Sequence, residues 1–406
     1  MTLSSHPSRP ASGFSLVELM VALALGLLLT TAMVTVYVTS KSSFSRQQQL
    51  SSLQQSVRIA FEYLAGDARM VGHMGCYTGM PTNANCGTNT FCNQIVAPDV
   101  RSNYAFGVEG YEYTTGAYTL TSNSPANITT AANWATNVAT NAGAANTIAP
   151  ATIGGAAGLT PGSDVVLIRT ATGRPVRLAA AVPGTNQNTL SLENMAGGTC
   201  SNGTTAKVSG LCANSHALIA SCKSARVFEV QSISTATPAV LTVKLGTTLG
   251  ADPEYTTAGA EVFPMQTIAY YVKQSSSGTG TSLYRRVFDG DNANGLEQEL
   301  IEGVENMQVR YGVDTTTPDP DGIVDLYVNA KGATGTATDS VTDWSRVVAV
   351  RMSLLMRSAT PIEAGTSVAA TGVVGGVTVT YPTTGSKYDR RVFTTTVAVR
   401  NKISYF

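Results

Sequence analysis

The stretch Gly13-Phe14-Ser15-Leu16-Val17-Glu18 opens an apolar run without charged side chains that covers residues 19–40. A helix rises about 1.5 Å per residue, so a helix over this run would cross the roughly 30 Å hydrocarbon core of a bilayer. The run therefore predicts a helix that can span a membrane. Glu18 at its entrance needs an explanation, because an ionised group in or beside hydrocarbon is costly and is usually functional.

Residues 1–13 form a short polar segment that carries Arg9 and no acid, which is typical of a targeting leader. Two other interpretations compete. A secretory signal peptide could be cut after Ala22-Leu23-Ala24, but this small-x-small site lies inside the apolar run. A plain uncleaved membrane anchor agrees with the hydropathy and leaves Glu18 unexplained.

Residues 13–22 resemble the class III signal of type IV pilins and type II secretion pseudopilins. The resemblance implies that a prepilin peptidase cuts between Gly13 and Phe14 and methylates the new amino terminus of Phe14. It also implies an assembly role for Glu18, which would meet the terminal amine of a neighbouring subunit. Each charge alone would be costly beside an apolar phase, and the pair would compensate.

The composition excludes some classes of function. The 406 residues and 43% hydrophobic content suffice for a large core, and 26 basic residues balance 26 acidic ones. Nucleic-acid binding is not expected, because there is no basic excess and the arginine pairs at 285–286 and 390–391 lack interleaved aromatic residues. Such pairs are typical of soluble sheet edges. The abundance of Thr, Ser, Asn, Gly and Ala favours an exported, β-rich protein.

An even number of cysteines follows the apolar run, which predicts disulfides in an oxidising compartment such as the periplasm. They are Cys76, Cys86, Cys92, Cys200, Cys212 and Cys222. We expect Cys86 and Cys92 to close a local loop, with one or more bridges among the later three. A metal site is disfavoured, because no Cys-x-x-Cys pair occurs and only His73 and His216 follow the leader.

Beyond the apolar run the helical pattern continues. A polar stretch over residues 41–49 is followed by apolar residues at spacings of three and four, which form one stripe on a helix. They are Leu50, Leu53, Val57, Phe61 and Leu64. The sequence predicts one helix over residues 14–70, with a transmembrane part over 14–40 and an amphipathic part over 41–70 that packs on a sheet.

Residues 71–406 are predicted to form a β-rich periplasmic or extracellular head. Its first part reads as a disulfide-tied surface loop over residues 76–103, a hairpin around Tyr111, Tyr113 and Tyr118, and a weakly specified surface excursion over 122–158. Strand patterns follow at 164–169, 226–230, 240–243, 268–272, 282–287, 307–311, 348–356 and 391–400.

The strands at 268–272 and 282–287 flank a Ser/Gly turn and predict a hairpin. The economical arrangement of all these strands is an antiparallel sheet with one covered face, against which the amphipathic part of the helix packs. The predicted fold class is α+β, a long pilin-type helix packed on a large head dominated by antiparallel sheet.

A second resemblance lies near the end of the chain. Residues 303–314, 344–351, 391–393 and 397–401 resemble the PilW family of minor type IV pilins. This implies a low-abundance subunit that joins other minor pilins in the pilus initiation or tip complex, from which the major pilin polymerises. The complex can also carry a large tip adhesin.

The resemblance implies a protein of the inner membrane, single-pass with its head in the periplasm, that engages the pilus assembly platform and then enters the pilus. Two alternatives stay open. One is a minor pseudopilin of the type II secretion system. The other, of a different class, is an adhesin or ligand-binding module displayed at the tip.

No enzymatic motif accompanies these features. The sequence has no Gly-x-Ser-x-Gly elbow, phosphate-binding loop, His-Glu-x-x-His or dinucleotide fingerprint, so we expect neither catalysis nor a cofactor. His73 and His216 are interpreted as loop or surface residues. A weak calcium candidate comprises Asp319, Asp321 and Asp325, after Asp314. Flanking prolines and a missing terminal Glu favour a solvated turn there.

Overall fold

The protein is described by a computed structural model of the full chain, which divides into two compact units, residues 1–52 and 53–406. The structure describes residues 13, 15–77, 91–95, 99–113, 118–120, 126–129, 133–137, 147–182, 188–193, 197–201, 207–234, 238–243, 255–257, 259–291, 294–318, 320–362, 370–382 and 387–399.

Helix α1 covers Leu16–Arg69, close to the predicted helix. In its first unit the apolar side chains are exposed along the helix. In the second unit Leu53, Val57 and Leu64 of the predicted stripe are buried, and Phe61 packs against the same cluster. Ala60 and Ala68 are buried on this face as well. They were not part of the predicted stripe, because alanine contributes little to a pattern of large apolar residues.

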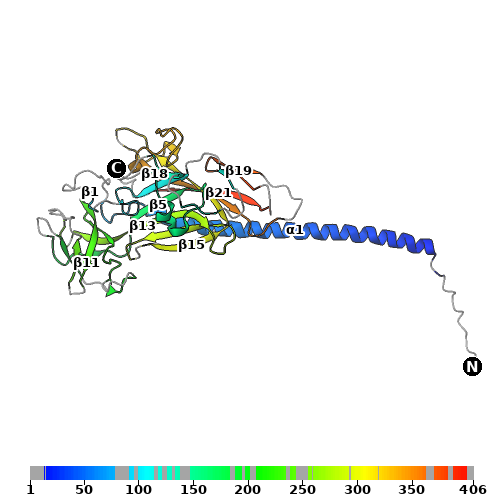
Figure 1. Ribbon diagram of the computed structural model, residues 1–406, viewed down its shortest axis with the longest axis horizontal. Helices are drawn as coiled ribbons and strands as arrows, with labels where there is room; N and C mark the ends of the chain where they lie inside the picture. Colours follow the sequence, from blue (N-terminus) through cyan, green and yellow to red (C-terminus); the bar gives the residue numbers. More distant parts are fainter. Residues whose placement is uncertain are drawn as a thin grey trace, which may run out of the picture. The chain divides into compact units, whose positions relative to one another are not determined.

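The second unit is dominated by a sheet of twelve strands among the described residues (Figure 1). Its main path runs through β4 (Trp134–Ala135), β2 (Val108–Tyr113), β5 (Val165–Ala171), β13 (Glu261–Gln274), β10 (His216–Ala220), β11 (Ala225–Ile233), β12 (Ala239–Val243) and β7 (Thr189–Leu192). Off this path lie β1 (Phe91–Asn93), β6 (Val176–Arg177), β14 (Thr281–Phe288) and β15 (Leu296–Glu302).

The described residues also form three smaller sheets. A four-stranded sheet has the order β17 (Leu326–Val328), β16 (Val304–Val313), β18 (Val347–Arg357) and β21 (Arg390–Ala398). A three-stranded sheet combines β19 (Thr371–Val374), β20 (Val377–Thr380) and β3 (Tyr118–Thr119), and β8 (Gly197–Gly198) pairs with β9 (Lys207–Val208). Short helices occur at α2 (Pro150–Gly154), η2 (Gly155–Ala157) and η3 (Trp344–Arg346).

The predicted hairpin is present. β13 and β14 pair antiparallel from Thr267↔Phe288 to Gln274↔Thr281, around a turn in which Gly278 and Gly280 take positive φ. Successive side chains of a strand point to opposite faces of the sheet, so alternate residues of β13 and β14 face the helix. Ile268, Tyr270 and Leu283 join the cluster that contains the buried face of α1. The prediction that the helix covers this sheet is confirmed.

The expectation of a single covered face is wrong for the centre of the sheet. All seven residues of β5 are buried, and the first four alternate between two clusters. Val166 and Ile168 face the helix side, whereas Val165 and Leu167 face a second core. A strand buried on both faces reads as a continuous apolar run, which is the pattern of this stretch.

The second core is built partly from the segment interpreted as a surface excursion. Trp134 is fully buried, its Nε1 donates to the carbonyl of Ser163 at 2.8 Å, and Ile148 and Ile153 are buried beside it. That interpretation is wrong for these described residues. A few large apolar side chains hold the segment in the core. The low-complexity composition around them gives no sequence pattern that predicts their burial.

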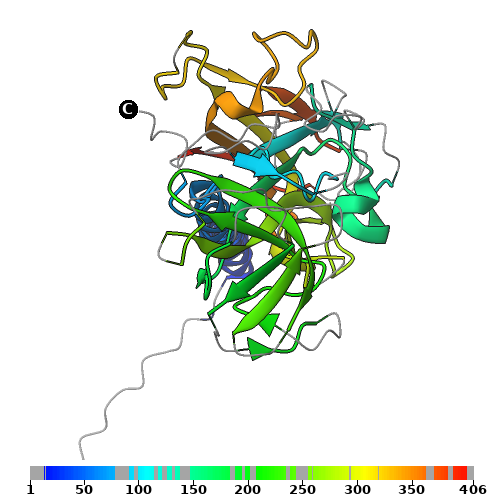
Figure 2. The same cartoon turned by 90° about the vertical axis from the view of Figure 1, so that its left-hand side faces the viewer.

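Two other expectations are corrected. The tyrosine-rich segment is not a hairpin, because β2 pairs with β4 and β5 while β3 pairs in parallel with β20. The stretch predicted as a surface loop contributes buried residues, including Phe91 and Asn103, and β1 pairs in parallel with β11. In Figures 1 and 2 the green strands β10–β12 lie on the other side of the head from the orange strand β18.

Candidate functional site

The amino-terminal site lies at the start of α1. The amide of Leu19 donates to the carbonyl of Ser15 at 3.1 Å, which closes the first helical turn, and Glu18 is exposed in that turn. A carboxylate is favoured there, because the helix dipole places partial positive charge at the amino terminus. Gly13 is exposed with open space around it, and Phe14 lies outside the described residues.

The helix after Glu18 has the properties of a membrane segment. Among the described residues, α1 is long and apolar enough to cross a membrane. Its polar side chains are satisfied internally, since the hydroxyls of Thr31, Thr35 and Thr39 each donate to a carbonyl three or four residues earlier at 2.8 Å. Hydroxyls bonded in this way can enter hydrocarbon at low cost. Glu18 is the only charged residue between Leu16 and Ser40.

At the other end of α1, Asp67 connects the helix to the sheet. Its carboxylate accepts from the Nε of Arg285 at 2.7 Å and from the hydroxyl of Tyr270. Both strands that supply these partners belong to the predicted hairpin, β13 and β14. Burial, together with the nearby Asp67, raises the pKa of Tyr270 and keeps its hydroxyl a donor. Sequence reasoning missed this contact, because Asp67 and Arg285 are 218 residues apart.

Two disulfides are described. Cys76 pairs with Cys222 across 146 residues, and Cys200 pairs with Cys212. The second pair is the expected bridge among the later three cysteines, whereas the long-range partner of Cys222 was not anticipated. Cys92 is also disulfide-bonded. Its expected partner, Cys86, lies outside the described residues.

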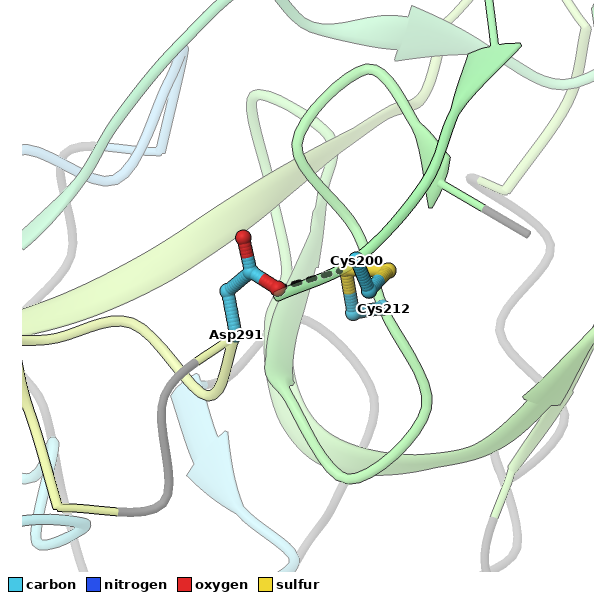
Figure 3. Close-up of side chains that lie close together, drawn as sticks. All are labelled: Cys200, Cys212 and Asp291. Atoms are coloured by element: carbon cyan, nitrogen blue, oxygen red, sulfur yellow. Dashed lines mark hydrogen bonds between the residues drawn. A yellow bond between two sulfur atoms is a disulfide. The ribbon is translucent and has the colours of Figure 1, made fainter. Parts of the chain in front are cut away.

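Figure 3 shows Asp291 beside the Cys200–Cys212 bridge, with Oδ1 3.6 Å from the Cys212 sulfur. The three side chains could be mistaken for a metal centre. However, disulfide sulfurs are not thiolates, and a thiolate is the form that binds zinc. The carboxylate is already engaged by Lys207 Nζ at 2.8 Å and by the hydroxyl of Ser201 at 3.1 Å. The cluster therefore ties the bridge to the turn after β14.

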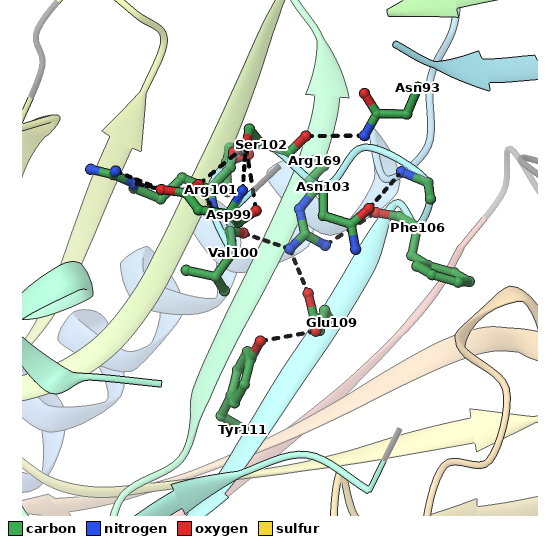
Figure 4. A network of polar contacts seen from close by, with 12 residues as sticks. Asn93, Asp99, Val100, Arg101, Ser102, Asn103, Phe106, Glu109, Tyr111 and Arg169 are labelled. Carbon is green, nitrogen blue, oxygen red and sulfur yellow. Dashed lines mark hydrogen bonds and ion pairs between the residues drawn. The ribbon is translucent and has the colours of Figure 1, made fainter. Parts of the chain in front are cut away.

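A buried ion pair lies on the large sheet between β2 and β5 (Figure 4). Glu109 and Arg169 are both almost fully buried and form the pair. Tyr111 donates to Glu109 at 3.0 Å, and Arg169 donates to the carbonyls of Val100 and Phe106 at 2.7 and 3.3 Å. The guanidinium thus orders the segment before β2. The Nε of Arg169 is buried without a hydrogen-bond partner, and a buried pair of this kind is weak evidence for stability.

A second acidic pair lies where the two largest sheets meet. Asp164 accepts from the amide of Tyr113 at 3.2 Å and from that of Val309 at 2.9 Å, so it bridges β2 and β16. Burial raises the pKa of Asp164 to about 7. Burial and the charge of Asp164 raise the pKa of Glu112 well above its usual range. Two buried carboxyls this close are expected to share a proton.

Comparison with known proteins finds two family models that match parts of the chain. A family model described as Type IV Pilus-assembly protein W, PilW, matches residues 269–401, and a model of the prokaryotic N-terminal methylation motif matches residues 8–34. The chain therefore carries a PilW-type domain and a prepilin-type methylation motif, which support a type IV pilin-like protein. The PilW match contains β14 through β21, including the whole four-stranded sheet.

Other comparisons add little. Among solved structures, a type IV-like pilin from Thermus thermophilus is similar over 47% of this chain and 86% of that one, at 15% identity. Its TM-score is 0.18, so the likeness carries no argument. No curated protein sequence matches the chain. Pilin-type families are structural, which agrees with the expectation of a non-enzymatic protein.

The described residues of the calcium candidate hold a turn together. Asp321 accepts from the amide of Ile323, and Asp325 accepts from the amide and hydroxyl of Thr315. Asp314 is buried and accepts from the amide of Gly322 at 2.7 Å. Asp319 lies outside the described residues, and calcium binding stays an untested prediction.

The histidines and arginines differ from expectation in part. His216 lies in β10 and is half-buried, with Nδ1 3.2 Å from the hydroxyl of Tyr104, so it is not a loop residue. The interpretation of the arginine pairs as edge-solubilising is wrong for Arg285, Arg286 and Arg390, which have buried or half-buried carboxylate partners. Only Arg391 is largely exposed.

Proposed function

We propose that this chain is a PilW-family minor type IV pilin of the pilus initiation or tip complex. Prepilin peptidase would cut between Gly13 and Phe14 and methylate Phe14. The helix would then hold the protein in the inner membrane with its head in the periplasm until assembly. Glu18 would direct entry into the complex by compensating the terminal amine of a neighbouring subunit.

One observation carries this proposal. The methylation motif at residues 8–34 ends within an exposed apolar helix whose only charged residue up to Ser40 is Glu18. A free membrane anchor gains nothing from such a carboxylate, because burying it without a partner is costly. A terminal ammonium on a neighbouring subunit would supply that partner. The PilW match favours a pilus over a secretion pseudopilus, which would use the same amino-terminal chemistry.

The assembly role is tested by Glu18→Ala in cells that build the pilus. Membrane insertion and leader cleavage should be unchanged, because both precede assembly, while incorporation into sheared pili should be lost. Glu62→Ala is the matched control, since Glu62 is exposed on the same helix beyond the apolar run. Normal incorporation of Glu18→Ala would remove the assembly role of this residue.

A further inference from the structure

The face of the four-stranded sheet that points away from the helix-side core carries two half-buried arginines directly opposite each other, and the Nε of Arg310 is buried without a hydrogen-bond partner. Arg310 of β16 and Arg351 of β18 are Cα partners, so their side chains leave the sheet on the same face. Thr396 of β21 is the next partner across, opposite Arg351. We call Arg310, Arg351 and Thr396 the arginine row. All three lie within the residues matched by the PilW family model.

Neither arginine of the row has a carboxylate within 4.0 Å among the residues that the structure describes. On the same sheet, by contrast, Arg357 and Arg390 both pair with the buried Glu305. Like charges placed directly opposite each other on a sheet destabilise it. The charge of Arg310 acts on Glu112, but that acid is buried and burial raises its pKa, which makes it a poor counter-ion. The described residues therefore supply no carboxylate within 4.0 Å of either guanidinium.

The guanidinium of Arg351 is held in place. It lies over the ring of Tyr327, 3.6 Å from the centroid, and its Nε donates to the hydroxyl of Thr396 at 3.2 Å. Tyr327 reaches Arg351 from the neighbouring strand β17, where it lies opposite Gly312 of β16. A stacked and oriented guanidinium loses little freedom when it binds a planar anion such as a carboxylate.

The surface beside the row is open. The side chains of Val392, Thr394, Thr396 and Ala398 occupy alternate positions of β21 and are all exposed. Among the described residues β21 pairs only with β18, so it is the last strand of its sheet. An extended segment lying along such a strand would bring alternate side chains next to the row.

We propose that the arginine row, together with the exposed face of β21, binds acidic side chains on an extended segment of a partner protein. A carboxylate fits better than a nucleic-acid backbone for two reasons. The other outward positions of β21 are neutral, whereas nucleic-acid surfaces carry extended basic patches. The Tyr327 ring is already stacked on Arg351 and is not free to stack on a base. This inference goes beyond the assembly role of Glu18 and does not depend on it.

The test uses the full-length chain purified in a non-ionic detergent. The probe is a short fluorescent peptide in which glutamate and threonine alternate, and binding is read by fluorescence anisotropy at low salt. The double variant Arg310→Gln/Arg351→Gln should bind the peptide at least about 10-fold more weakly than the unaltered chain. Arg351→Lys should fall between the two, because it keeps the charge but loses the planar fork.

Arg174→Gln is the control, since Arg174 is exposed and has no carboxylate partner among the described residues. It should bind like the unaltered chain. Matching thermal unfolding curves would show that the variants are folded. Equal binding by the double variant, or no peptide binding by the unaltered chain, would overturn the proposal. Tighter binding of single-stranded DNA of the same charge would overturn it in favour of a nucleic-acid surface.

Discussion

Asp164 links two sheets, and its burial beside Glu112 makes the stability of the protein depend on pH. Asp164 holds backbone amides from both sheets, which requires it to be buried. Glu112 is buried beside it, and its Oε2 has no hydrogen-bond partner. Burial penalises the charged form of each acid, so both pKa values lie above their ordinary values.

This pair makes stability depend on pH in a defined direction. An acid whose pKa is raised by folding contributes stability at low pH and loses it as the pH rises through its folded pKa. The ordinary value for Asp is 3.8 and that of Asp164 is raised to about 7. The contribution of Asp164 to the free energy of unfolding should therefore fall between about pH 4 and pH 7, and that of Glu112 should fall as the pH rises above the ordinary pKa of Glu.

Glu112→Gln isolates the effect, because glutamine mimics the protonated acid at every pH. Its free energy of unfolding, relative to the unaltered chain, should rise progressively as the pH increases above the ordinary pKa of Glu, 4.5. Chemical denaturation at a series of pH values measures this difference. The exposed Glu193→Gln serves as the control and should show a flat difference. A flat difference for Glu112→Gln as well would mean that Glu112 is ionised in the folded protein.

Asp67 is the residue that fixes the end of α1 to the hairpin. Asp67→Asn should destabilise the second unit by about 1–3 kcal/mol, because it leaves the half-buried guanidinium of Arg285 without its charged acceptor. Glu62→Gln, on the exposed side of the same helix, should change stability by less than about 0.5 kcal/mol. Denaturant titration distinguishes the two, and equal values would show that the Asp67 contact is screened by solvent.

At the scale of elements, the second half of α1 acts as a core element of the head. Leu64 is fully buried in the cluster shared with β5 and β13, whereas Ile59 on the same helix is 51% exposed. Leu64→Ala should cost about 2–5 kcal/mol through lost burial and the cavity left behind. Ile59→Ala should cost far less. Similar losses for both variants would mean that the helix does not pack on the sheet through this stripe.

Elements set by local pattern were predictable from the sequence. The hairpin β13–β14 follows from two alternating strands around a Ser/Gly turn, and the long helix follows from its apolar periodicity. The strands β16, β18 and β21 were recognised individually. Their pairing joins residues far apart in the chain, as in Met352↔Thr395, which no local pattern specifies.

What the sequence did not reveal depends on distant contacts or on isolated large residues. The Cys76–Cys222 bridge spans 146 residues, and no spacing rule selects it. Trp134 anchors a core segment from within a stretch whose composition resembles a surface loop. Of the candidate site, Gly13 and Glu18 were recognisable because their motif is contiguous. The contact of Asp67 with Arg285 joins two elements and could be seen only in the structure.

At the scale of the whole molecule, charged residues are few, and many of them form ion pairs inside the head. The chain has 26 basic and 26 acidic residues among 406, and many described arginines are paired with carboxylates inside the head. Glu18 and the arginine row are among the charged sites for which the described residues supply no opposite charge within 4.0 Å. Both proposals assign that opposite charge to another subunit or partner.

The proposed assembly role requires cleavage between Gly13 and Phe14. The intact mass of the protein tests this cleavage most directly. The chain would be purified from membranes of a host with and without its prepilin peptidase. We predict a chain that begins at N-methylated Phe14 when the peptidase is present and at Met1 when it is absent. A chain that begins at Met1 in both hosts, or that is cut after Ala24, would contradict the account.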